Sequence, residues 1–245
     1  MPDLAAAYRE AREAMIELAR SADDSATSTM VPACPDWSVR TLVAHVTSLA
    51  TEISTGRIPR DLNLIQFWDA DTSQRRDDFV DAALDQRRTL ELSEILDEWE
   101  RSGPHIEKMI DGREPFPDGT MPLADWVLTT DVGVHLQDLQ GALGTTEYRD
   151  AVASSLALRS YVEAMRIRSV HEKLPAFRMR ADNREWVIGT GEPVATVTGE
   201  TWELGRAASG RRSPDQIRAY DWDGDPEPFM ALFYPYGLRE SALVE

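Results

Sequence analysis

Cysteine is nearly absent from this sequence: Cys34 is the only one among 245 residues. A single thiol excludes an internal disulfide framework and any zinc site built from several cysteines. If the chain binds a metal ion, its ligands must therefore be histidine and carboxylate side chains.

Long apolar runs and an excess of positive charge are also missing. No segment approaches the roughly 20 apolar residues that span a membrane, and the opening MPDLAAAYREAREAM carries acids where a signal peptide needs cations. The 26 lysines and arginines face 43 aspartates and glutamates, which gives a net charge of −17. Such a charge repels nucleic acid and anionic lipid surfaces. We expect a cytoplasmic protein with neither nucleic-acid nor membrane partners.

Enough apolar sequence is present for a core, because 42% of the residues are hydrophobic in a chain long enough for one large domain or two modest ones. Apolar residues at helical spacing predict helices at about residues 3–22, 39–55, 77–110 and 123–142, the third with allowance for an interruption. Residues 56–63, GRIPRDLN, are typical of a loop. Four amphipathic helices fit an up-and-down bundle with one longer connection.

The sequence pattern changes from helical to strand-like after residue 174. One more helix is expected at about residues 150–173. Runs with alternating or β-branched composition then predict strands at 176–182, 184–190, 194–200 and 216–224, and short helices at 200–208 and 226–235. We therefore predict an α+β fold, with a four-helix bundle over residues 1–148 and a smaller α/β domain over residues 149–245.

A segment with two prolines precedes the second predicted helix, and His45 lies on one face of that helix. Pro32 and Pro35 restrict the backbone, Trp37 offers a large apolar anchor, and Ser38 is a good N-cap. At about 100° per residue, His45 lies at the edge of the apolar face, where it can reach a cleft between helices. The alternative is a histidine at the edge of the core that bonds to a backbone carbonyl.

Asp131 and His135 stand four residues apart on the fourth predicted helix and so share a face. Together with an imidazole from a facing helix, they would make a set of two histidines and one carboxylate that leaves coordination positions open for water or substrate. Helical bundles commonly build metal sites from such inward-facing side chains. The alternative is a pair that only stabilises its own helix.

Four other residues invite weaker interpretations. Cys34 can act as a nucleophile, but its place in the helix entry favours a small packing residue. Asp138 can orient His135, or it can be a solvated helix acid. His105 and His171 are expected to face solvent on helices.

Three arginines in the second half of the sequence lie close together. Arg211 and Arg212 are part of the segment SGRRS, and Arg206 precedes it. A guanidinium can bind a carboxylate through two parallel hydrogen bonds, so Arg206 and Arg211 are candidates for binding a substrate or cosubstrate. An exposed loop is the simpler interpretation.

The segments VPACPDWSVRTLVAHV and HLQDLQGAL resemble the mycothiol-dependent maleylpyruvate isomerase family. This resemblance implies a DinB-like four-helix bundle followed by a small C-terminal domain. It also implies mycothiol as the thiol cosubstrate and a divalent metal ion, usually zinc, held here by His45, Asp131 and His135. The family usually has glutamate at the carboxylate position, so Asp131 shortens that ligand by one methylene.

The function that the resemblance implies is a metal-dependent isomerase or S-transferase that acts on a small electrophilic substrate. A metal ion stabilises a bound thiolate at neutral pH, and the thiolate is the nucleophile. Addition to a conjugated double bond would allow rotation before elimination in an isomerase, whereas a transferase would keep the adduct. Two alternatives stay open: a non-catalytic metal- or ligand-binding module of the same fold, and a metal-dependent hydrolase that activates water.

Overall fold

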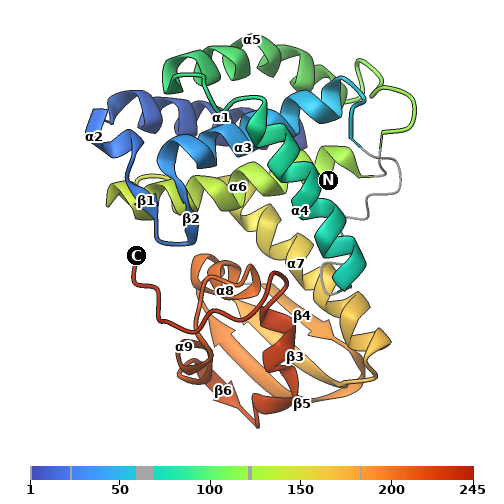
Figure 1. Ribbon diagram of the computed structural model, residues 1–245. Helices are drawn as coiled ribbons and strands as arrows, with labels where there is room; N and C mark the ends of the chain where they lie inside the picture. Colours follow the sequence, from blue (N-terminus) through green and yellow to red (C-terminus); the bar gives the residue numbers. More distant parts are fainter. Residues whose placement is uncertain (1, 23, 59–68, 121–122, 183) are drawn as a thin grey trace. The chain divides into compact units, whose positions relative to one another are not determined.

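The structure is a computed structural model that describes residues 2–22, 24–58, 69–120, 123–182 and 184–245 (Figure 1). The chain forms two compact units, which divide between Leu156 and Ala157, with Asp69 assigned to the second unit. The division lies inside helix α7 (Val152–His171). The boundary expected from the sequence, after residue 148, precedes this helix.

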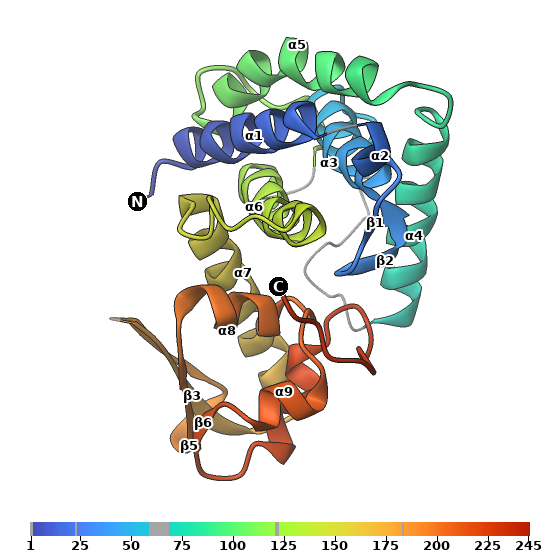
Figure 2. The same cartoon turned by 90° about the vertical axis from the view of Figure 1, so that its left-hand side faces the viewer.

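The first unit is a bundle of helices, as predicted. Helices α1 (Leu4–Ser21), α3 (Val39–Ser54), α5 (Leu92–Ile110) and α6 (Ala124–Leu143) pack against one another, with α4 (Ala70–Asp85) beside α3 and the short α2 (Asp24–Thr27) after α1 (Figures 1 and 2). The apolar spacing read from the sequence supplies the core. Its largest fully buried side chains include Tyr8, Met15, Leu42, Ile53, Ile95, Leu96, Trp99, Ile106 and Leu136.

Two predicted helix ends are confirmed by their capping geometry. The Ser38 hydroxyl accepts a hydrogen bond from the backbone N–H of Thr41 at 3.2 Å, so it caps the start of α3. Gly144 follows the end of α6 with a φ of 68°, and its N–H donates to the carbonyl of Gln140. Glycine suits this left-handed position because it has no Cβ.

The segment before α3 contains a small hairpin that the sequence did not predict. Strand β1 (Met30–Val31) pairs antiparallel with β2 (Cys34–Ser38). Two prolines and the short strands hid the β pattern. The hairpin nevertheless determines where Cys34 and Trp37 lie.

The predicted helix over residues 77–110 is interrupted. Helix α4 ends at Asp85 and α5 starts at Leu92, after Glu91 and Glu94 form a capping box. The guanidinium of Arg40 donates to backbone carbonyls in the turn between them, including that of Leu90 at 2.6 Å. The predicted loop at 56–63 lies outside the described residues from residue 59 onward.

The second unit is built on a four-stranded sheet with the order β4–β3–β5–β6. The strands are β3 (Pro175–Ala181), β4 (Arg184–Ile188), β5 (Thr190–Gly199) and β6 (Asp221–Asp223), and only the β3–β5 pairing is parallel among these described strands. Helix α8 (Thr201–Ala208) and the second half of α7 contribute to one core around Phe177. The predicted α+β class is confirmed.

Two expectations for the second unit need correction. The strand predicted over 216–224 is limited to Asp221–Asp223, because Ser213 caps a short helix, α9 (Pro214–Arg218), that takes up its first residues. The helix predicted over 226–235 is a 3₁₀ helix, η1 (Glu227–Phe233), which buries Phe229 and Phe233. None of the helices in the described ranges is both long and apolar enough to cross a membrane.

Candidate metal centre

Helices α3 and α6 bring His45, Asp131 and His135 together. Oδ1 of Asp131 lies 3.5 Å from Nε2 of His45 and 3.6 Å from Nε2 of His135. The two imidazole rings stand edge to face, with centroids 4.9 Å apart. Both histidines are buried, while the side chain of Asp131 is 23% exposed. The three residues predicted as ligands thus converge on one place, and one side of it is open to solvent.

The donor set suits a divalent cation. Two imidazole nitrogens and one carboxylate oxygen lie within 4.8 Å of one another, and zinc and related metals are bound by this combination of ligands. The distances from the imidazoles to Asp131 exceed those of ordinary hydrogen bonds. The cluster is therefore spaced more loosely than a hydrogen-bonded triad, and its residues fit a metal ion.

His45 does not bond to a backbone carbonyl, so the alternative interpretation of this residue is wrong. Its Nδ1 is buried and has no hydrogen-bond partner among the described residues. A buried imidazole nitrogen without a partner costs free energy. The histidine is thus held for something other than a core hydrogen bond.

Asp138 contacts the Nδ1 side of His135, opposite the Nε2 atom that faces Asp131. Its Oδ2 lies 2.9 Å from Nδ1 of His135, and Asp138 is completely buried. The alternative of a solvated helix acid is wrong. A carboxylate in this place keeps the proton on Nδ1 and leaves the Nε2 lone pair for a metal, an arrangement common at metal-bound histidines.

The charges around His135 control its protonation. Burial by itself lowers its pKa, but the negative charges of Asp131 and Asp138 outweigh this effect and raise the pKa to about 10. Without a metal ion, the imidazole therefore carries a positive charge at neutral pH. A cation that binds at Nε2 takes the place of a proton.

The β1–β2 hairpin contributes two residues whose position the sequence did not reveal. The ring of Trp37 lies 4.7 Å from the ring of His45 and 5.8 Å from that of His135, measured between centroids. Cys34 Sγ lies 3.5 Å from Oδ2 of Asp138. Cys34, which the sequence places in the helix entry, thus contacts the buried carboxylate that holds His135.

The other histidines lie elsewhere. His105 is exposed on α5, where its Nδ1 lies 2.8 Å from Glu114 Oε2, and His171 is exposed at the end of α7. Both face solvent, as expected.

Arg206, Arg211 and Arg212 of the second unit are buried, so the exposed-loop interpretation is wrong. Arg206 donates from Nε to Oε2 of Glu245 at 2.9 Å. Arg212 donates to Glu203 at 2.6 and 2.8 Å and to Glu245 at 3.1 Å. Arg211 donates to the backbone carbonyl of Ser209 at 2.6 Å, and its guanidinium lies 6.0 Å from the ring of Tyr236.

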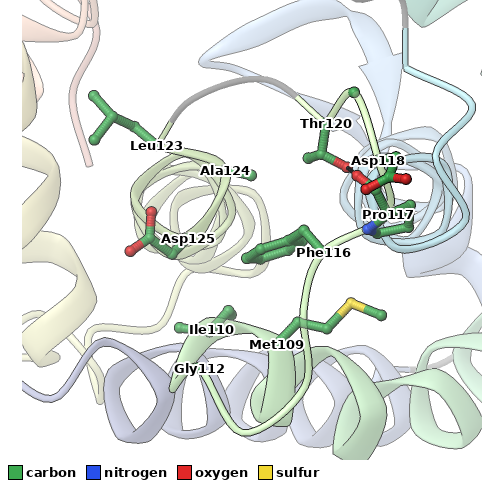
Figure 3. Close-up of a pocket in the computed structure, with 11 residues that line it drawn as sticks. Met109, Ile110, Gly112, Phe116, Pro117, Asp118, Thr120, Leu123, Ala124 and Asp125 are labelled. Carbon is green, nitrogen blue, oxygen red and sulfur yellow. Dashed lines mark hydrogen bonds between the residues drawn. The ribbon is translucent and has the colours of Figure 1, made fainter.

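A cavity of about 470 Å³ lies between the end of α5 and the start of α6 (Figure 3). Met109, Ile110 and Phe116 give it an apolar lining, and Asp125 stands at its edge. Asp125 precedes Asp131 by six positions, which corresponds to roughly 9 Å along the helix axis and roughly 240° around it. The cavity is therefore separate from the histidine cluster.

Comparison with known proteins gives a consistent result. The model of the family described as mycothiol maleylpyruvate isomerase N-terminal domain matches residues 8–140, which include His45, Asp131 and His135. None of the curated proteins matches the chain.

Two solved structures are similar in fold. They are crystal structures of the mycothiol-dependent maleylpyruvate isomerase and of its variant with one histidine changed to alanine, with 16% and 14% sequence identity. Each match covers 86% of this chain and 90% of that chain, with a TM-score of 0.56.

Proposed function

Because this chain belongs to the mycothiol maleylpyruvate isomerase N-terminal domain family, we propose that it is a metal-dependent enzyme that uses mycothiol. It acts as an isomerase or an S-transferase on a small electrophilic substrate. The observation that carries this proposal is the convergence of His45, Asp131 and His135, which come from two helices and face one another with the ligand atoms of a divalent metal site.

In this proposal His45, Asp131 and His135 hold the metal ion, with zinc as the first choice. Three protein ligands leave coordination positions for a cosubstrate. A bound divalent ion lowers the pKa of a thiol and so supplies a thiolate at neutral pH. Asp138 keeps the proton on Nδ1 of His135, and Trp37 packs against both imidazole rings, which restricts their rotation.

We also propose that Arg206 and Arg211 bind a carboxylate of the substrate or cosubstrate. The support is chemical: Arg206 pairs with a carboxylate of this chain, that of Glu245, and a substrate carboxylate would have to take its place. Guanidinium groups recognise carboxylates through paired, charge-assisted hydrogen bonds. In Arg211→Lys and Arg206→Lys variants, a rise in KM without a matching fall in kcat would support substrate binding.

The test is to measure bound metal and turnover in the purified protein, with and without mycothiol, for the parent and two histidine variants. His45→Ala should lose both the metal and the activity. His105→Ala is the matched control, because its histidine is exposed and pairs only with a surface glutamate among the contacts described for it.

Each outcome selects one function. Turnover that needs both metal and mycothiol supports the proposal. Turnover that needs metal but no thiol identifies a hydrolase, and bound metal without turnover of maleylpyruvate or other electrophiles identifies a binding module. A parent protein that binds no divalent metal contradicts the proposal.

A further inference from the structure

The β1–β2 hairpin places a thiol beside the buried carboxylate that holds His135. Oδ2 of Asp138 lies 3.5 Å from Cys34 Sγ and 2.9 Å from Nδ1 of His135, so both groups meet the same oxygen. Asp138 has no exposed surface. Because solvent does not reach this carboxylate, donors from the protein must stabilise its charge.

We propose that Cys34 is a positioning residue of the metal centre. Its S–H donates to Asp138 and fixes the carboxylate, and the carboxylate in turn fixes the ring of His135 with Nε2 on the side of Asp131. This inference rests on the metal site proposed above.

The thiol suits this task because it is a weak donor. It restrains Asp138 while leaving most of the negative charge on the oxygen that accepts from His135. A direct hydrogen-bond partner of a ligand histidine typically contributes about 10–100-fold to metal affinity. Cys34 also interacts with His135, but the close partner of Nδ1 is Asp138 at 2.9 Å, so for Cys34 we expect about tenfold, the lower end of that range.

Two other roles for this thiol make different predictions. Cys34, His135 and Asp138 form a second group whose ligand atoms lie within 4.8 Å of one another, so Cys34 can be imagined as a direct ligand. Alternatively, the side chain only packs the hairpin, where Cys34 pairs with the fully buried Val31. Val31→Ala is therefore a matched control, because it disturbs the hairpin without touching the carboxylate.

The experiment measures zinc affinity by competition with a chelator, after circular dichroism has confirmed that each metal-free variant is folded. Cys34→Ala should bind zinc about tenfold more weakly than the parent. Cys34→Ser should keep most of the affinity, because a hydroxyl also donates to Asp138. Val31→Ala should keep the parent affinity. In an Asp138→Asn background, adding Cys34→Ala should have a much smaller effect than in the parent, because the thiol acts chiefly through that carboxylate.

Four results would overturn the inference. Equal losses of affinity in Cys34→Ala and Val31→Ala would mean that only hairpin packing matters. A loss in Cys34→Ser as large as in Cys34→Ala, with sulfur-to-metal charge-transfer absorption in the cobalt-loaded parent, would make Cys34 a direct ligand. If the parent binds zinc and Cys34→Ala binds it with the same affinity, Cys34 is not a positioning residue, and the proposed function is unaffected. A parent that binds no zinc would refute both.

Discussion

Two buried clusters, one in each unit, differ in the spacing of their polar atoms. In the second unit, Arg212 donates to Glu203 at 2.6 and 2.8 Å. In the first unit, the Nε2 atoms of His45 and His135 lie 3.5 and 3.6 Å from Oδ1 of Asp131. The arginine cluster has ordinary hydrogen-bond lengths, and the histidine cluster does not.

This difference separates a cluster whose charges are already paired from one whose spacing suits a cation. Opposite charges at hydrogen-bond distance satisfy each other. In the histidine cluster, the carboxylate of Asp131 and two imidazoles face one another without such contact, and Nδ1 of His45 has no partner among the described residues. Sequence alone suggested binding roles for both clusters, but only the histidine cluster has the spacing of a site that a cation completes.

The largest effect is expected from breaking the arginine cluster. Removing one member of a buried ion pair leaves the other charge without compensation. Arg212→Ala should lower the free energy of unfolding by about 3 kcal/mol, the lower end of the usual range because Glu203 is partly exposed. Urea denaturation followed by circular dichroism measures this. Arg218→Ala, which breaks the exposed pair with Glu227, should have little effect. Similar losses of unfolding free energy in Arg212→Ala and Arg218→Ala would refute the claim that the buried arginine cluster stabilises the protein more than an exposed pair does.

Removing the metal should be the next largest effect. An ion that binds only the folded state stabilises it by about 2.7 kcal/mol when its free concentration is 100 times Kd. A chelator should therefore lower the melting temperature of the metal-loaded parent and of the His105→Ala control. His45→Ala should show no response to the chelator. An unchanged melting curve after verified removal of the metal would mean that the bundle does not use the ion.

Asp131 stands where the family resemblance implies a glutamate. Asp131→Asn keeps the size and removes the charge, so zinc affinity should fall at least about tenfold while the fold survives. Asp131→Glu should retain or improve binding if the site accepts the longer side chain. A chelator competition measures both. If Asp131→Asn binds zinc as tightly as the parent, Asp131 is only a helix acid and the binding-module alternative gains support.

Metal affinity should also depend on pH. The pKa of His135 is raised to about 10, so its imidazole holds a proton below that pH and must release it when the metal binds. Zinc affinity should therefore rise by about tenfold per pH unit between pH 6 and 8. Calorimetry in buffers of different ionisation enthalpy would detect the released proton. Affinity that does not change with pH would contradict this.

Helices and candidate ligands that follow from local spacing could be predicted from the sequence. The apolar periodicity and Ser38 define α3, and the four-residue interval between Asp131 and His135 places both on one face of α6. The resemblance to a known family then connected His45 to this pair. These features need no knowledge of distant contacts.

Features that depend on distant contacts could not be predicted. Cys34 contacts Asp138, which lies 104 positions later in the sequence, and no residue near Cys34 indicates that contact. The burial of Arg212 likewise depends on Glu245, which lies 33 positions away. Proline-rich composition hid the β1–β2 hairpin. Helix α9, by contrast, starts at a local capping box at Ser213, a signal that competed with the strand pattern of the residues that follow it.

The most direct test of the central claim is X-ray absorption spectroscopy of the zinc-loaded protein before and after addition of mycothiol. Without mycothiol, we expect nitrogen and oxygen ligands from His45, Asp131 and His135, and no sulfur. After addition, we expect one sulfur at about 2.3 Å from zinc. A spectrum that gains no sulfur when mycothiol is added, or that contains sulfur before it is added, would contradict the claim that these three residues hold a metal ion to which the cosubstrate thiol binds.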